Sequence, residues 1–177
     1  MRQGKEYLFV DGYNIINAWP ELIDKASENI ESARQTLLDI LIEYKHYVDI
    51  HVIIVFDAYK VKGTSLKKEK VGGVEVIYTK ENETADAYIE KVLNEIGRSK
   101  KVSVASSDGM LQQLIMSRGG LRISAREFYH IVNDTKADIR RKNQKIADNR
   151  LNYRTTLDSE TIKKLNQFAI NQQLEEN

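Results

Sequence analysis

Residues 7–16, YLFVDGYNII, pass from an apolar run straight into Asp11, Gly12 and Asn14. A short, continuous apolar run is typical of a buried strand. The aspartate at its end has two interpretations: either the strand simply stops there, or the strand delivers a charged group to a site. The pattern of the remaining strands bears on that choice.

Strand-like and helix-like periods alternate along the rest of the chain. The further strand-like runs are HVIIVFDAY at 51–59, VEVIYTK at 74–80, KVSVASSD at 101–108 and LRIS at 121–124. Helix-like segments lie between or after them, at 27–48, 85–96, 110–117 and 125–149. Strands that alternate with helices predict an α/β fold with a mainly parallel central sheet of about five strands, flanked by helices.

The length of the chain suits one domain with a small extension. We expect residues 1–149 to form the domain and residues 150–177 to form a C-terminal helical extension that packs on it. The extension carries an apolar stripe at helical spacing over 159–173, with Ser159 as its N-cap. The lysine-rich segment 60–73 is the only long insertion, and we expect it to be a loop.

The composition excludes several classes of protein. The 177 residues include no cysteine, which excludes disulfides, thiol nucleophiles and thiolate zinc sites. The three histidines are scattered, so any metal would be held by oxygen ligands. No apolar run approaches the roughly 18 residues of a membrane span, and we expect a cytoplasmic protein without a membrane contact. The lack of a GxGxxG motif and of a P-loop argues against a nucleotide cofactor.

Asp57 and Asp108 repeat the pattern of Asp11, because each comes at the end of an apolar strand. The carboxyl ends of parallel strands meet at one edge of a sheet, which is where ligands bind. Asp86 falls in the first turn of the helix expected at 85–96. Taken singly, Asp86 and Asp108 are equally well explained as helix-start residues. Four carboxylates together are harder to explain, because their repulsion destabilises a fold unless cations neutralise them.

A divalent ion is the simplest neutraliser of such a cluster. Mg²⁺ and Mn²⁺ take oxygen ligands and keep several waters, so Asn14 and the hydroxyl of Ser106 or Ser107 could supplement the aspartates. Ions of this kind clamp a phosphate and lower the pKa of a bound water. The chemistry indicated is phosphodiester hydrolysis.

Four segments resemble a known family: FVDGYNII at 9–16, VFDAY at 55–59, YTKENETADAYIE at 78–90 and VASSDGMLQ at 104–112. In this order they resemble the motifs of the NYN branch of PIN-like nucleases, and most closely those of the YacP family of bacterial ribosome-associated endoribonucleases. The resemblance covers the chain to about Asn149. It implies a PIN-like three-layer fold and a Mg²⁺- or Mn²⁺-dependent endoribonuclease that associates with the ribosome and cleaves mRNA in the A site.

The resemblance also implies roles for individual residues. Carried over by position, the catalytic group is Asp11, Asn14, Asp57, Asp86 and Asp108. Asp11, Asp86 and Asp108 are the expected metal ligands, either directly or through water. Asp57 could instead orient a water or a neighbouring side chain.

Two basic segments are the expected contacts to RNA or to the ribosome. The first follows the strand that ends near Asp57, on the same edge of the sheet, and contributes Lys60, Lys62, Lys67 and Lys68. The second lies in the polar helix-like segment and contributes Arg140, Arg141, Lys142 and Lys145. In a chain of net charge +1, such segments suit local contact with a polyanion, although ordinary solvated surfaces would look the same.

Two other interpretations stay open at this point. The first is a catalytically silent RNA- or ribosome-binding module with the same fold, which predicts a degraded acidic cluster, whereas this chain keeps all four aspartates. The second is a phosphoryl-transfer enzyme or a receiver-like domain. Aspartyl-phosphate hydrolases commonly have a DxD motif at the first strand, and here Tyr13 stands at the second acidic position.

Overall fold

The computed structural model describes residues 6–57, 66–96 and 100–156, together with residues 161, 163, 164 and 167. The chain divides into two compact units, Met1–Thr135 and Lys136–Asn177. Lys60, Lys62 and most of the helix expected at 159–173 lie outside the described residues. Within the described part, no helix is long and apolar enough to cross a membrane.

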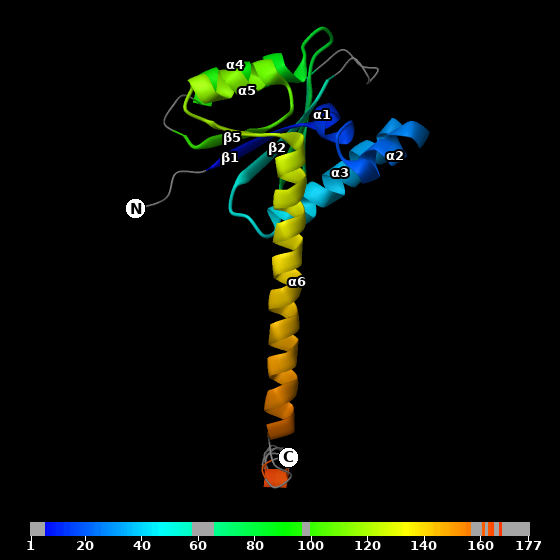
Figure 1. The fold of residues 1–177 in the computed structure, drawn as a ribbon, viewed down its shortest axis with the longest axis vertical. Helices are drawn as coiled ribbons and strands as arrows, with labels where there is room; N and C mark the ends of the chain where they lie inside the picture. Colours follow the sequence, from blue (N-terminus) through cyan, green and yellow to red (C-terminus); the bar gives the residue numbers. More distant parts are fainter. Residues whose placement is uncertain are drawn as a thin grey trace, which may run out of the picture. The chain divides into compact units, whose positions relative to one another are not determined.

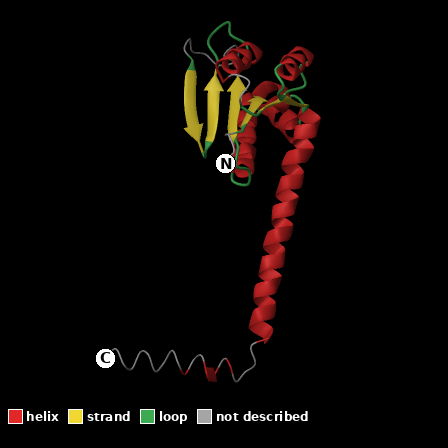
Figure 2. Cartoon of the chain, turned by 90° about the vertical axis from the view of Figure 1, so that its left-hand side faces the viewer, coloured by secondary structure: helices red, strands yellow, loops and turns green. Residues whose placement is uncertain are grey.

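The first unit is built on a six-stranded sheet in the order β3-β4-β2-β1-β5-β6. The strands are β1 (Tyr7–Asp11), β2 (His51–Phe56), β3 (Lys67–Val71), β4 (Val74–Tyr78), β5 (Val102–Ala105) and β6 (Leu121–Ile123). All neighbouring pairs are parallel except β3 and β4. The α/β fold with a mainly parallel sheet is therefore confirmed (Figure 2).

The sequence predicted a loop over residues 60–73, and this is wrong for Lys67–Val71, which form strand β3. Its first four residues are charged, as suits the edge of a sheet, where lysines discourage pairing with other chains. Gly72 and Gly73, with φ angles of 56° and 87°, make the two-residue turn that pairs β3 with β4. The strand could not be recognised by apolar alternation, since it has no buried residue.

The helices are α1 (Gly12–Ile16), α2 (Pro20–Glu28), α3 (Ile30–Lys45), α4 (Ala85–Ile96), α5 (Gly109–Ser117) and α6 (Ala125–Thr156). The helix expected at 27–48 begins later, at Ile30, because the Asn29 side chain caps it by accepting from the Glu31 amide at 2.8 Å. Pro20 opens α2 at the first helical position, where a missing N–H costs nothing.

Two apolar cores cover the two faces of the sheet, as the alternation of side chains along the strands requires. Leu8 and Val10 of β1 face α1, α2, α3 and the first turns of α6. Phe9 faces the opposite way, toward α4 and α5. Figure 1 shows these two groups of helices on opposite sides of the sheet. The result is a three-layer fold in which β1, β4, β5 and β6 are each followed by a helix on one face or the other.

Helix α6 belongs to both units. Its first turns contribute Ala125, Phe128 and Val132 to the core of the first unit. It then continues as one helix through Asn149, the boundary expected from sequence, as far as Thr156. The packing of residues 150–177 on the domain stays a prediction.

Trp19 packs against the start of α6 and donates a hydrogen bond to it. Trp19→Phe is therefore expected to lower the free energy of unfolding by about 2 kcal/mol. The indole is 1% exposed, donates to the Ala125 carbonyl at 2.9 Å and lies against Phe128 and Tyr129. Phenylalanine keeps an aromatic ring but loses this donor. Urea unfolding of the variant, compared with Tyr47→Phe at an exposed position, measures the difference. Equal stability of both variants would contradict this role of the indole.

Candidate active site

The expected aspartates lie where the strand order changes direction. From β1 the chain builds the sheet outward through β2 and β4, whereas β5 and β6 extend it on the other side of β1. The helices that follow β1 pack on one face of the sheet, and α5, which follows β5, packs on the other. The crevice between β1 and β5 is therefore a topological switch point, where open α/β sheets bind their ligands. Asp11 ends β1, and Ser106 to Asp108 follow β5.

Asp11 and Asn14 are joined to the loop after β5 by hydrogen bonds. One oxygen of Asp11 accepts from the Asn14 amide at 3.2 Å, and the other accepts from the Ser106 hydroxyl at 3.3 Å. The Asn14 side-chain oxygen accepts from the Ser107 amide at 2.8 Å. The Ser107 hydroxyl in turn accepts from the Ala125 amide at 3.2 Å. The turn after β1 and the loop after β5 are therefore fixed to each other at the switch point.

Asp57 holds the start of a helix from another strand. It follows β2, and its Oδ1 accepts from the backbone amide of Ala85, the first residue of α4. This is one of the orphan amides at a helix start, which a carboxylate satisfies well. Asp57 thereby helps to set the position of the next residue, Asp86.

The loop before α4 is built to present Asp86. The buried Thr79 hydroxyl donates to the Glu83 carbonyl at 2.6 Å, and Asn82 adopts a φ of 68°, a conformation that asparagine tolerates. The Thr84 hydroxyl accepts from the Ala87 amide at 3.1 Å and so serves as the local cap. Asp86 is therefore not needed as a cap.

One carboxylate oxygen of Asp86 has no hydrogen-bond partner. Its Oδ1 is buried, and no donor reaches it from the described part of the chain. A buried polar atom without a partner costs about 1–3 kcal/mol, and more when it carries charge. The interpretation of Asp86 as a simple helix-start residue does not account for this arrangement, which needs a ligand or a proton.

Asp108 caps the start of a helix, which is one of the two roles that the sequence allowed for it. Its Oδ1 accepts from the amides of Met110 and Leu111, both at 2.9 Å, and so caps α5. Its own amide donates to the Ser106 hydroxyl at 3.1 Å. Capping engages Oδ1, so Oδ2 is the oxygen left for another partner.

Two of the four carboxylates have raised pKa values. Burial is the largest cause that raises the pKa of Asp11 to about 6; the charges of Asp86 and Asp57 contribute to this rise, and its hydrogen bonds to Asn14 and Ser106 oppose it. Burial also raises the pKa of Asp86, and the charges of Asp108 and Asp57 add to that shift. The structure therefore brings the four predicted aspartates into one electrostatic cluster. We call Asp11, Asp57, Asp86 and Asp108 the acidic cluster.

The raised pKa of Asp11 predicts that Asp11→Asn stabilises the fold at neutral pH. The pKa of Asp11 is about 6 in the folded state against an ordinary value of 3.8, so the folded state binds more protons between these two pH values. Stability then falls as pH rises from about 4 to 6, and the penalty persists above that range. We expect a gain of about 2 kcal/mol for the variant at pH 7.5 and little at pH 4.

Urea unfolding at pH 4, 5, 6 and 7.5 measures this gain. Asp49→Asn, at an exposed position, serves as the control with the same chemical change. A gain that does not vary with pH, or one shared by the control, would contradict the assignment of the penalty to Asp11.

The carboxylates of the acidic cluster do not form a set of three side chains that could ligate one metal ion directly. Among residues 6–57, 66–96 and 100–149, no three acidic or histidine side chains are grouped as a metal-binding set. Charge repulsion acts over longer distances than direct ligation, so this agrees with the raised pKa values of Asp11 and Asp86. The hydrogen bonds explain why the four carboxylates do not form a direct ligand set. Asp57 and Asp108 each direct an oxygen to backbone amides at a helix start.

Two of the expected basic contacts of the first segment are described. Lys67 lies opposite Tyr78 at the carboxyl end of β4, so it reaches the edge of the sheet that carries the acidic cluster. Its ammonium lies 5.7 Å from the centre of the Tyr78 ring and 3.2 Å from Glu69. Lys68 points to the other face, with its ammonium 5.5 Å from the Tyr88 ring centre. Binding of RNA by either lysine stays a prediction.

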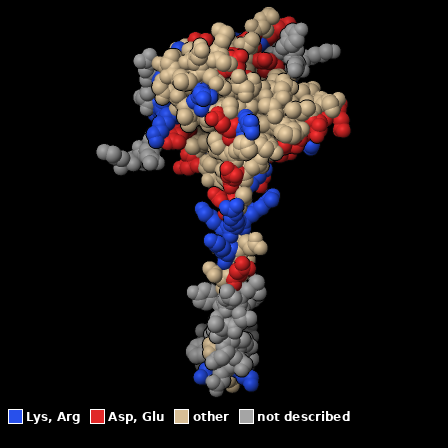
Figure 3. All heavy atoms as spheres, viewed as in Figure 1, with Lys and Arg blue, Asp and Glu red and all other residues tan. Residues whose placement is uncertain are grey.

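The second basic segment lies on α6. Within the second unit, Arg140, Arg141, Lys142 and Lys145 are all exposed. Figure 3 shows basic side chains gathered on this part of the helix. Arg141 lies 3.4 Å from Asp138 in an exposed pair, which contributes little to stability. These charges are therefore available to a partner.

Three further residues support the site, and sequence reasoning passed over two of them, Gln112 and Arg34. The Gln112 amide donates to the Ser106 carbonyl at 2.7 Å and so steadies the loop after β5. Arg34, 6% exposed, donates to the Tyr13 hydroxyl at 3.3 Å behind the turn after β1. Gly12 is needed because a Cβ there would collide with the ring of Phe56. Gln112 and Gly12 lie inside the motifs already noted, whereas no local signal marked Arg34.

Comparison with known proteins gives a consistent result. Residues 8–169 match the family described as the YacP-like NYN domain. The YacP protein of Bacillus subtilis (strain 168) is 42% identical over 159 residues, which cover 89% of this chain and 93% of that protein. The crystal structure of Rae1 (YacP) from Bacillus subtilis superposes with a TM-score of 0.68 at 40% identity, covering 92% of this chain and 94% of that one. A mutant of the same protein gives a TM-score of 0.67 at 41% identity, covering 80% and 82%.

Proposed function

Because the chain belongs to the YacP-like NYN domain family, whose NYN domains are generally nucleases, we propose that it is a metal-dependent endoribonuclease. It associates with the ribosome and cleaves mRNA in the A site during translation. The observation that carries the proposal is the acidic cluster at the switch point, with the raised pKa values of Asp11 and Asp86 and an Asp86 oxygen that has no donor among the described residues.

The residues present fit a divalent ion. Asp86 offers a buried oxygen that lacks a donor, and Asp11 and Asp86 both carry a pKa raised in part by neighbouring charges, which a cation would reverse. Asp11, Asp86 and Asp108 would hold Mg²⁺ or Mn²⁺, largely through water, as hard cations with few direct protein ligands do. When bound, such an ion neutralises phosphate charge and makes a bound water more acidic.

The protein's own groups position the reacting atoms. Ser106 and the Asn14 amide hold the Asp11 carboxylate in place by hydrogen bonds to its two oxygens. Asp57 fixes the start of α4 and with it Asp86. Attack by water rather than by the ribose 2′-hydroxyl leaves a 5′-phosphate and a 3′-hydroxyl.

Basic side chains would offset the negative charge of the acidic cluster toward RNA. Lys67 reaches the edge of the sheet that carries the cluster, and the exposed group on α6 offers a second contact to phosphates. Lys60 and Lys62 belong to the same proposal. Contacts of this kind bind RNA without reading its sequence, so the ribosome would supply much of the choice of substrate.

Removing metal tests the proposal on the isolated protein. Mg²⁺ or Mn²⁺ at 100 times its dissociation constant is expected to raise the free energy of unfolding by about 2.7 kcal/mol, because only the folded state holds the ion. The gain should disappear in Asp86→Asn and persist in Glu95→Gln, which alters an exposed residue of the same helix. Urea unfolding with and without chelator measures it. Equal metal effects on both variants would place the ion elsewhere.

Cleavage itself is tested with ribosomes stalled on a defined mRNA in a purified translation system. Ribosomes with an empty A site are expected to support cutting of the mRNA there. Ribosomes whose A site holds a tRNA are expected to protect it. Cutting that does not depend on A-site occupancy would support an endoribonuclease but contradict cleavage in the A site. Binding without any cutting would favour the catalytically silent module.

A further inference from the structure

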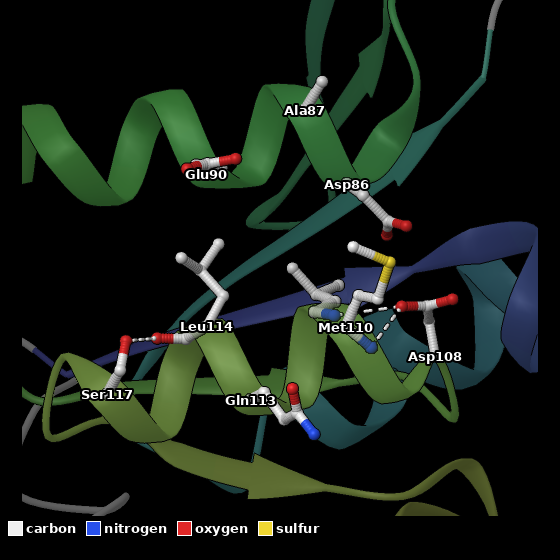
Figure 4. Close-up of a pocket in the computed structure, with 9 residues that line it drawn as sticks. Asp86, Ala87, Glu90, Asp108, Met110, Gln113, Leu114 and Ser117 are labelled. Carbon is white, nitrogen blue, oxygen red and sulfur yellow. Dashed lines mark hydrogen bonds between the residues drawn. The ribbon is translucent and has the colours of Figure 1, made fainter.

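The acidic cluster borders a pocket, and the lining of that pocket beyond Asp86 and Asp108 has no part in the hydrolysis described above. It opens between α4 and α5, with Asp86 and Asp108 toward one end and Ser117 toward the other (Figure 4). Its volume of about 590 Å³ lies within the range of pockets that hold small organic ligands. Any RNA whose phosphate reaches Asp86 and Asp108 therefore has this pocket directly beside it.

The apolar lining of the pocket suits a flat ring. Leu111 and Leu114 line it from α5, and Met110 adds a side chain that is 83% exposed. Large apolar side chains are seldom so exposed, and an exposed thioether packs well against an aromatic ring. In Figure 4 Leu114 points toward α4, across the space that a ring would occupy.

The polar lining of the pocket is rich in hydrogen-bond acceptors. Glu90 is exposed and makes no hydrogen bond or ion pair with the described residues of the chain. The Ser117 hydroxyl donates to the Leu114 carbonyl at 2.7 Å, so its oxygen is left to accept. With Asp86 and Asp108 at the other end, a phosphate would be repelled from the interior of the pocket. A neutral ring that carries N–H donors satisfies both constraints.

We propose that this pocket binds the base of the nucleotide next to the scissile phosphate, and that Glu90 accepts a hydrogen bond from the exocyclic amino group of that base. The proposal rests on the proposed function for the identity of the ligand as RNA. Adenine, cytosine and guanine carry an exocyclic amino group, and carboxylates pair with such groups in base recognition. Uracil has none, and its N3–H lies between two carbonyl oxygens that a carboxylate repels. The pocket therefore disfavours uracil at this position.

The chain offers its own reporters for a binding test. It has three methionines, and Met110 lines the pocket while Met116 lies on the same helix outside the lining. Titration with cytidine, adenosine or uridine, followed by the NMR signals of the methionine methyl groups, needs neither metal nor cleavage. A base stacked in the pocket is expected to shift the Met110 methyl in a saturable way and to leave Met116 unchanged. Uridine is expected to bind about fivefold or more weakly than cytidine.

Two variants on α4 separate the role of Glu90 from a general effect of charge. Glu90→Ala is expected to remove the difference between cytidine and uridine, whereas Glu95→Ala, at an exposed position outside the pocket, should keep it. No movement of the Met110 methyl with any nucleoside would overturn the proposal. Equal binding of cytidine and uridine by the natural protein would overturn the role of Glu90. A Met110 methyl that moves only when ribosomes are added would also overturn it, because the occupant would then be a ribosomal surface.

A cleavage assay distinguishes failure of this proposal from failure of the proposed function. On translated messages, cuts are expected to avoid uridine at the neighbouring position, and Glu90→Ala is expected to lose that avoidance. If the protein binds cytidine at Met110 but never cuts RNA, the nuclease fails and the base site stands. If it cuts RNA without any base preference and without nucleoside binding, the nuclease stands and the base site fails.

Discussion

Asp86→Asn lowers the rate of mRNA cleavage by at least about a hundredfold while the protein remains folded; this is the largest expected effect on activity. The carboxylate lies in the acidic cluster, and its buried Oδ1 has no donor among the described residues, so a ligand must satisfy it. An asparagine side chain has nearly the same shape but lacks the charge that holds a cation. Substituting it should also relieve repulsion from Asp108 and Asp57, so the variant should be at least as stable as the natural protein at neutral pH.

Single-turnover cleavage of a translated message measures this loss, and urea unfolding checks the fold of each variant. Glu95→Gln makes the same chemical change at an exposed position of α4 and should cut normally. A loss of activity that follows a loss of stability would point to misfolding instead. Full activity of a stable Asp86→Asn variant would contradict the role given to this carboxylate.

Replacing Arg140, Arg141 and Lys142 by glutamate is expected to weaken ribosome association by at least about a hundredfold at physiological salt. All three side chains are exposed on α6, and the Arg141 pair with Asp138 is too exposed to stabilise the helix much. Reversal of three charges replaces attraction to phosphates by repulsion. The dependence of binding on salt should also become less steep, because fewer counterions are released.

Co-sedimentation with ribosomes over a series of salt concentrations measures both quantities. A triple variant at Lys25, Lys91 and Lys100, also changed to glutamate, carries the same net charge and controls for it, since these lysines are exposed elsewhere. Equal weakening in both triple variants would show that net charge alone governs association. Unchanged binding by the α6 variant would remove this segment from the interface.

Much of the site could be predicted from sequence because strand ends in a parallel sheet share an edge. Asp11 could be placed from its apolar run alone, since the run is short, continuous and followed at once by Gly12. The aspartate at the end of β1 had two interpretations, a strand that stops and a strand that delivers a charged group, and both apply. Asp11 begins the next helix by accepting from Asn14, and it also lies in a cluster whose charges raise its pKa.

The sequence could not predict which hydrogen-bond partner each polar group has in the folded chain. The sequence placed Asp57 at a strand end and Asp86 at a helix start. It did not reveal that the Ala85 amide engages Asp57, or that one Asp86 oxygen finds no donor among the described residues. Strand β3 was missed for a related reason, because its pairing with β4 comes from backbone hydrogen bonds and the turn at Gly72 and Gly73, without any apolar pattern.

The most direct test is to map the cut positions on a translated mRNA in a purified translation system with the natural protein, Asp86→Asn and Glu95→Gln. We expect cuts at the A-site codon with the natural protein and with Glu95→Gln, products that carry a 5′-phosphate, and no cuts with Asp86→Asn. Cuts that persist in a folded Asp86→Asn variant, or that are absent with the natural protein bound to ribosomes, would contradict a metal-dependent endoribonuclease centred on the acidic cluster.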